Sequence, residues 1–280
     1  MRFKKVAIIW MGFMGGSLGF DLNRLKTCGS IMGIGRNKAR LKKARIKKAC
    51  THITRHFEEG VRGADLVVIS LPVLLIPAVF ARIKPYLGKN AVVTDMGSTK
   101  ADIVSKIDEI DLNRNFAGSH PMVGSEKTGV LNLRPGLYKG GTCVVTPSAK
   151  TGKTAAKKII AFWRMLGMKV IVMSPEEHDR AVGRISHFPH LTSFVLATMA
   201  GTVINKNREI IGPGFRDATR IAASSEDIWA EVFLSNKKEI LKDIDAAIEE
   251  LDALSQMIYM NKVKELKEYI KKARQLREKI

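Results

Sequence analysis

Residues 6–17 read Val-Ala-Ile-Ile-Trp-Met-Gly-Phe-Met-Gly-Gly-Ser, an apolar run followed at once by closely spaced glycines. A buried strand that turns into a helix through glycines is typical of a dinucleotide-binding βαβ unit. Gly12 and Gly15 match the second and third glycines of the pattern G-x-G-x-x-G, which permit close approach of a pyrophosphate and of the strand. Trp10 stands where the first glycine makes the tight turn, so we expect that turn to be strained or reshaped.

The helix that follows would offer free N–H groups and its positive dipole end to a pyrophosphate. The second strand ends at Gly35-Arg36, without the acidic residue that binds the ribose hydroxyls of NAD. Residues 36–48 contain eight basic side chains and no acidic one, which modestly favours NADP, although residues 42–48 fit a solvated helix better. We therefore expect NAD or NADP, contacted by Gly12, Phe13, Met14, Gly15 and Arg36.

The pattern of apolar runs predicts an α/β chain. Short β-branched runs alternate with helical patterns, and we expect strands at 6–9, 30–34, 66–70, 91–95, 116–118, 142–145 and 170–173. Continuous apolar runs indicate strands covered on both faces, hence a doubly wound, mostly parallel sheet of the Rossmann type. We place this domain at residues 1–175 and an all-α domain at residues 176–280.

The all-α domain ends in a long helical pattern with an apolar stripe. The stripe contains Ile244, Ile248, Leu251, Leu254 and Ile258, at spacings of three and four. Such a stripe often meets a second subunit, and packing within its own chain is the equal alternative.

Composition excludes several classes of protein. The chain has 280 residues, 45% of them hydrophobic, so it is neither disordered nor fibrous. Three scattered cysteines support neither a disulfide framework nor a zinc site, and they fit a reducing cytoplasmic setting; we expect no bound metal. The longest apolar stretch, residues 66–81, is shorter than the ~20 residues of a membrane span and contains prolines, so we expect no membrane segment.

The net charge of +20 raises the alternative of a non-catalytic nucleic-acid-binding protein on a Rossmann scaffold. The basic residues are scattered over helices without interleaved aromatic residues or a known reading motif, so we expect no nucleic-acid partner.

Four short motifs carry more information than the fold. They are D-x-G-S-x-K at 95–100, G-S-H-P at 118–121, S-H-x-P-H at 186–190 and F-x-D-x-T-R at 215–220. The first two are expected just past strand ends, where open α/β sheets bind ligands, and the other two lie in the helical domain. We therefore expect a site between the two domains.

In these motifs, taken in this order, the sequence resembles the prephenate dehydrogenase family, over about residues 5–240. The resemblance implies oxidative decarboxylation of prephenate to 4-hydroxyphenylpyruvate in tyrosine biosynthesis, with arogenate as the alternative substrate, and a homodimer formed by the C-terminal helices. It implies that His120 is the catalytic histidine and that Ser98 is its hydroxyl partner. It also implies that the substrate pocket contains His190, Arg220, Glu126, Asp217 and, from the neighbouring subunit, Trp229.

The chemistry suits these residue types. Hydride loss makes the substrate hydroxyl acidic, and a neutral imidazole can accept its proton. A guanidinium matches a carboxylate better than an ammonium does. Taken singly, each residue also has a structural explanation: His120 as a cap or core residue, and Arg220 as an ion-pair partner of Asp217. We expect His187 to be a packing residue and His178 to be a surface or packing residue.

Overall fold

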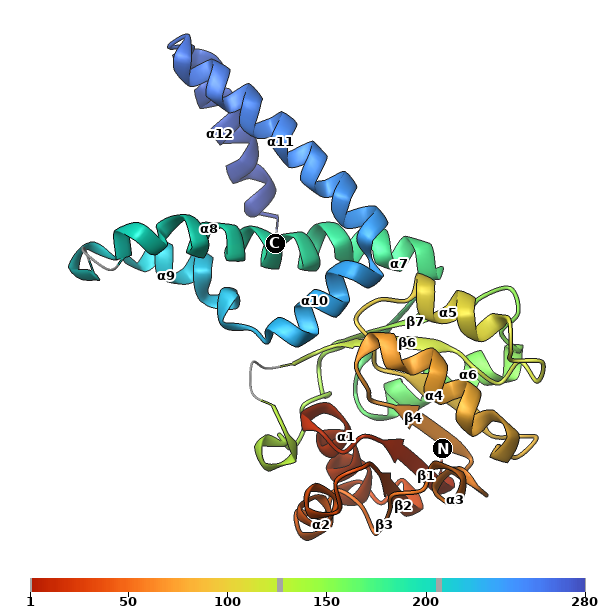
Figure 1. Ribbon diagram of the computed structural model, residues 1–280. Helices are drawn as coiled ribbons and strands as arrows, with labels where there is room; N and C mark the ends of the chain where they lie inside the picture. Colours follow the sequence, from red (N-terminus) through yellow and green to blue (C-terminus); the bar gives the residue numbers. More distant parts are fainter. Residues whose placement is uncertain (1, 125–127, 205–207, 280) are drawn as a thin grey trace.

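The computed structural model describes residues 2–124, 128–204 and 208–279 (Figure 1). The strands are β1 (Phe3–Ile9), β2 (Cys28–Ile34), β3 (His52–Thr54), β4 (Leu66–Ile69), β5 (Val92–Asp95), β6 (Gly118–Met122), β7 (Thr142–Thr146) and β8 (Lys169–Val172). The helices of the N-terminal part are α1 (Phe13–Arg24), α2 (Lys38–Ile46), α3 (Phe57–Val61), α4 (Ile76–Ile83), α5 (Ala101–Asp108) and α6 (Lys153–Met165). Those of the C-terminal part are α7 (Pro175–Val182), α8 (Phe188–Ile204), α9 (Pro213–Thr219), α10 (Glu226–Ser235), α11 (Lys237–Tyr259) and α12 (Val263–Arg277). Short helical turns are η1 (Val73–Leu75), η2 (Lys84–Tyr86), η3 (Val130–Asn132), η4 (Gly183–His187), η5 (Arg208–Ile210) and η6 (Arg220–Ala223).

The first sheet is parallel, in the order β3-β2-β1-β4-β5. Alternate residues of each strand enter two separate cores. In β1, Val6 and Ile8 pack with α1 and α6, while Ala7 and Ile9 pack with α4 and α5 on the other face. Because both faces are covered, the strands are apolar throughout. The predicted doubly wound sheet is confirmed, and β3 is a strand that we did not predict.

The second sheet, in the order β6-β7-β8, corrects part of the prediction. β6 runs antiparallel to β7, and only a bridge between Val93 and Phe116 continues the first sheet into this one. Among its described residues, the connection from β6 to β7 contains η3 and no crossover helix, so the chain turns back instead of crossing over. The G-S-H-P motif therefore lies within β6 and not past the end of a strand.

The C-terminal part is helical, as predicted, and leaves apolar side chains uncovered. α11 and α12 form a hairpin that extends away from the sheets (Figure 1). Ile248, Leu251 and Ile258 of the predicted stripe are more than half exposed. Packing within the chain therefore does not cover the stripe. Among the described residues, no helix has the length and apolarity needed to cross a bilayer.

Candidate active site

A buried ion pair joins the end of β5 to the start of α5. Lys100 Nζ contacts Asp95 Oδ2, and both side chains are fully buried. The same ammonium donates to the carbonyl of Ser119 (3.0 Å), while Asp95 Oδ1 accepts from the Ser119 N–H (3.0 Å). This pair fixes the loop that carries Ser98 beside β6, because a buried charge must keep its partners.

His120 lies in β6, one residue after Ser119, with its ring partly buried. Its Nδ1 is 2.9 Å from Nε2 of His178. Burial lowers the pKa of His120 well below its usual value, and the nearby His178 and Lys100 lower it further. The imidazole is therefore neutral near pH 7 and has a lone pair with which to accept a proton.

His178 does not lie on the surface, one of the two placements that we expected, and it has hydrogen-bond partners that the sequence did not show. It is fully buried in α7, and its Nδ1 is 2.7 Å from Oδ1 of Asp179. The Asp179 carboxylate accepts two backbone N–H groups at the beginning of α5, from Lys100 (2.7 Å) and Ala101 (2.9 Å). Three side chains thus form a chain of hydrogen bonds from α5 and α7 to β6.

His187 lies next to these hydrogen-bonded side chains, on a π-helical turn, η4. Its ring is buried, and its Nδ1 accepts from the Asn236 amide (3.1 Å), which also donates to the Asp179 carbonyl (2.8 Å). Burial lowers the pKa of His187 to about 4. These contacts agree with the predicted packing role.

The helical part contributes a second group of side chains. His190, in the first turn of α8, donates from Nδ1 to the Ser186 carbonyl (2.9 Å) and stacks on Trp229 at 3.6 Å between ring centroids. Burial is the main cause that lowers the pKa of His190, and the charge of Arg220 contributes. The structure thus brings His190, Trp229 and Arg220 together. Within this chain α10 carries Trp229 to His190, and a contribution of Trp229 to the pocket of the neighbouring subunit stays a prediction.

Arg220 and Asp217 do not form the ion pair considered as a structural alternative. Both are exposed, and no ion pair joins them to each other or to another described residue. The Arg220 guanidinium is therefore free to bind an anion. Ser98 lies in the loop before α5, and within the described chain its hydroxyl makes no hydrogen bond. Glu126 lies outside the described residues.

The glycine turn after β1 has the shape needed for a dinucleotide. Gly12 caps α1 without a side-chain hydrogen bond, so the first N–H groups, including those of Phe13 and Met14, are available. A Cβ on Gly15 would collide with the Trp10 carbonyl oxygen, so only glycine lets α1 pack this closely on β1. The strand order also reverses between β1 and β4, where such folds bind nucleotides.

Trp10 is strained, as expected. Its φ is +76°, a region that glycine adopts freely and tryptophan rarely does. Its indole lies against Gly12, and the Arg36 guanidinium is 5.9 Å from the ring centroid. These two side chains therefore form one surface at the carboxyl ends of β1 and β2.

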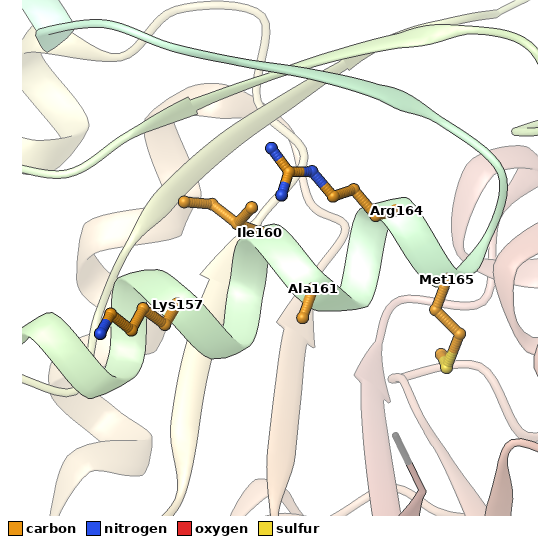
Figure 2. Close-up of a pocket in the computed structure, with 5 residues that line it drawn as sticks. All are labelled: Lys157, Ile160, Ala161, Arg164 and Met165. Atoms are coloured by element: carbon orange, nitrogen blue, oxygen red, sulfur yellow. The ribbon is translucent and has the colours of Figure 1, made fainter.

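An open hollow on α6 is separate from these groups. Figure 2 shows its five lining side chains, all from that one helix: Lys157, Ile160, Ala161, Arg164 and Met165. It contains no acid–base pair and none of the four motifs. The candidate site is therefore the group of residues around His120 and His190.

Similarity to known proteins agrees with this geometry. The nucleotide-binding domain of prephenate dehydrogenase matches residues 18–172, and the dimerization domain of prephenate dehydrogenase matches residues 174–272. The chain belongs to the prephenate dehydrogenase family. The prephenate dehydrogenase of Bacillus subtilis is 30% identical over 98% of this chain and 75% of its own length. The cyclohexadienyl dehydrogenase of Zymomonas mobilis is 29% identical over 98% and 95%.

A solved structure of the family is also similar. Prephenate dehydrogenase from A. aeolicus, in complex with hydroxyphenyl propionate and NAD+, superposes with a TM-score of 0.91 at 33% identity, covering 99% of this chain and 98% of the other. The protein is thus an NAD(P)-linked oxidoreductase of the prephenate dehydrogenase family. The fold seen here, a parallel Rossmann-type sheet followed by helices, is the fold of that family.

Sequence reasoning missed three residues that contact the site, namely Lys100, His178 and Asp179. Lys100 ends a motif that we quoted, yet we gave it no role; its spacing of five residues from Asp95 was the available signal. His178 and Asp179 lie in no recognised motif. Only the packing of α7 against the start of α5 brings them to His120, so no local spacing could have revealed them.

Proposed function

We propose that this prephenate dehydrogenase family member oxidises prephenate, with loss of carbon dioxide, to 4-hydroxyphenylpyruvate in tyrosine biosynthesis. The observation that carries the proposal is the neutral imidazole of His120, held by His178 at Nδ1. It lies in β6 beside the loop of Ser98, while His190 and Arg220 form a second, cation-bearing group.

His120 accepts the proton of the substrate hydroxyl in this proposal. When bound, the oxidised nicotinamide supplies the acceptor for the hydride. As hydride leaves the carbon that bears the hydroxyl, the oxygen becomes acidic, and the neutral imidazole takes its proton. The bond to the ring carboxylate then breaks and carbon dioxide leaves. The bonding electrons make the ring aromatic and its oxygen anionic, and that oxygen regains the proton from His120 to give the phenol. Ser98, whose hydroxyl is not engaged by another described residue, would hydrogen-bond the same substrate oxygen.

Arg220 would bind a carboxylate of the substrate, and His190 would bind the substrate beside it. The guanidinium is exposed and unpaired among the described residues, and it suits a carboxylate. Stacking on Trp229 fixes the plane of the His190 ring, and its Nδ1–H donates to the Ser186 carbonyl, which leaves Nε2 of the neutral ring to accept a hydrogen bond from the ligand. Glu126 and Asp217 are proposed as further pocket residues on the family resemblance.

Arogenate remains the alternative substrate. It carries an ammonium where prephenate has a keto group, and the oxidised ring is the same. We favour prephenate because the positive charge of Arg220, close to His190, repels an added ammonium. The test mixes purified protein with prephenate or arogenate, each with NAD or NADP, and follows the absorbance of the reduced cofactor. Faster turnover of prephenate is expected; turnover of arogenate alone contradicts the proposal.

For the cofactor, we modestly favour NADP over NAD. Gly35 replaces the usual acid, so no carboxylate repels a 2′-phosphate there. Arg36 is held near that position by the Trp10 ring, and Asn37 caps α2 by accepting the Arg40 N–H (3.0 Å). A guanidinium at the start of a helix suits a phosphate.

We also propose a homodimer formed through the C-terminal helices. The exposed apolar residues of α8 and α11, including Met199, Ile248 and Leu251, would be buried in it. The match of residues 174–272 to a dimerization domain supports this, and it begins two residues before our proposed second domain, residues 176–280. Sedimentation at micromolar concentration should give a dimer mass.

Three free cysteines among the described residues support a reducing, cytoplasmic setting.

A further inference from the structure

We propose that His178 and Asp179 are positioning residues that hold His120 in the tautomer whose Nε2 is free to accept the substrate proton. This inference rests on the proposed function, because it gives a reason why His120 acts through Nε2. It gives a role to His178 and Asp179, which lie outside all four motifs.

The positions of the protons along the hydrogen-bonded series Asp179–His178–His120 follow from the Asp179 carboxylate. Asp179 accepts the backbone N–H of Lys100 at Oδ1 and that of Ala101 at Oδ2, so both carboxylate oxygens act as acceptors. Because Oδ1 acts as an acceptor, we assign the 2.7 Å contact as a donation from Nδ1–H of His178.

The tautomer of His120 follows from that of His178. A neutral imidazole has one N–H, so His178 presents a lone pair at Nε2. The 2.9 Å contact must then be a donation from Nδ1–H of His120, whose own Nε2 is left without a proton. Burial lowers the pKa of both His120 and His178, which keeps both rings neutral as this assignment requires.

The same hydrogen-bonded residues can stabilise the positive charge that forms on His120 during the reaction. When Nε2 of His120 takes a proton, the ring becomes a cation whose Nδ1–H points at His178 and, through it, at the Asp179 carboxylate. This resembles the use of a buried aspartate to orient and stabilise a catalytic imidazole. The other groups near these rings are Lys100, Asp95 and His187, of which Lys100 and Asp95 already neutralise each other.

Asp179 also has a purely structural role to be separated from this one. It joins α7 to the beginning of α5 through two backbone N–H groups, and its carbonyl accepts from Asn236. A structural role predicts lower stability and altered substrate binding, whereas a positioning role predicts a change in the His120 tautomer and in turnover.

The experiment uses Asp179→Asn in the full-length protein. An asparagine amide that donates to Nδ1 of His178 would reverse both hydrogen bonds and leave Nε2 of His120 protonated. We expect kcat for prephenate to fall about 10²- to 10⁴-fold, with KM within about twofold of wild type. Nitrogen-15 NMR of histidine-labelled protein should show His120 protonated at Nδ1 in wild type and at Nε2 in the variant.

Asp111→Asn is the matched control. Asp111 is also buried and accepts a backbone N–H, from Phe116 at 2.8 Å, but makes no hydrogen bond to a histidine. It should leave kcat and the tautomer of His120 unchanged.

Several results would overturn the inference. An unchanged kcat in Asp179→Asn would do so, as would lost activity with an unchanged tautomer. If the variant does not fold, the wild-type spectrum decides: a proton on Nε2 of His120 contradicts the inference, and one on Nδ1 supports it. A wild-type protein that oxidises neither prephenate nor arogenate would instead refute the proposed function, and the tautomer measurement would stand apart from that result.

Discussion

The Trp229 indole stacks on the His190 imidazole, with ring centroids 3.6 Å apart and planes inclined by 21°. The pair joins α10 to the first turn of α8, and Phe233 packs against the indole from the next turn of α10, 5.5 Å away. His190 is therefore held in one orientation by residues that do not themselves need to touch a ligand. Its plane is set by aromatic packing and its Nδ1 by the Ser186 carbonyl.

Removing the indole should weaken substrate binding and leave the chemical step largely intact. An aromatic pair contributes about 0.5–1.5 kcal/mol, so Trp229→Ala should raise the KM for prephenate roughly two- to tenfold. Steady-state kinetics give the value. Trp229→Phe, which keeps a ring, should recover most of the loss. A large fall in kcat without a change in KM would show that Trp229 acts elsewhere.

Arg36 should determine the preference for the 2′-phosphate. In Arg36→Glu, a carboxylate at the end of β2 would repel that phosphate and could bind the ribose hydroxyls of NAD, so the ratio of kcat/KM for NADP over NAD should fall at least tenfold. Lys42→Glu makes the same charge change on the exposed face of α2 and is the matched control. Equal effects of the two changes would mean that only the overall basic charge matters.

Lys100 should be needed for stability as well as for the site. Its side chain is fully buried against Asp95, and leaving that carboxylate without its partner should cost about 3–5 kcal/mol in Lys100→Met. Urea unfolding measures the loss. Lys106→Met removes an exposed lysine that pairs with Asp102 on α5 and should change the midpoint little. Similar midpoints for the two variants would contradict the assignment of Lys100 as a buried structural charge.

Acid should destabilise the protein through His187. Burial lowers the pKa of this histidine in the folded chain to about 4, against 6.5 when unfolded. Between these values the unfolded chain binds a proton that the folded chain does not, so stability is full above pH 6.5 and falls as the pH drops toward 4. The difference corresponds to roughly 3 kcal/mol. Unfolding midpoints measured from pH 7 to pH 4 should fall less steeply in His187→Gln, whereas exposed His52→Gln should follow wild type.

The strands that form the sheet core could be predicted, because burial on both faces leaves a continuous apolar run such as residues 66–69. β3 could not, since three residues at a sheet edge, His52–Thr54, are too short to show a pattern. The direction of β6 depends on the chain turning back through η3, which no periodicity records. Strain at Trp10 could be predicted, because a glycine pattern leaves a position where only glycine fits without cost.

Some residues of the candidate site could likewise be predicted from the sequence, and others could not. Motif residues such as His120 and His190 could be identified from their neighbours in sequence, and the structure stacks His190 on Trp229, another predicted residue. His178, 58 residues from His120, could not, because only the packing of α7 brings it there. The alternative that paired Arg220 with Asp217 was reasonable from their spacing, yet η6 begins at Arg220 and the two side chains do not meet.

The dependence of kcat/KM on pH, measured for prephenate in wild type and in His120→Asn, tests the role of His120 most directly. Because the folded-state pKa of His120 lies well below 6.5, wild-type activity should be constant from pH 8 to 6.5 and decline only at lower pH, as the imidazole becomes protonated. His120→Asn should be about 10²- to 10⁴-fold slower across this range and should lack that acidic decline. Turnover within a few-fold of wild type, with the same acidic decline, would contradict the assignment of His120 as the proton acceptor.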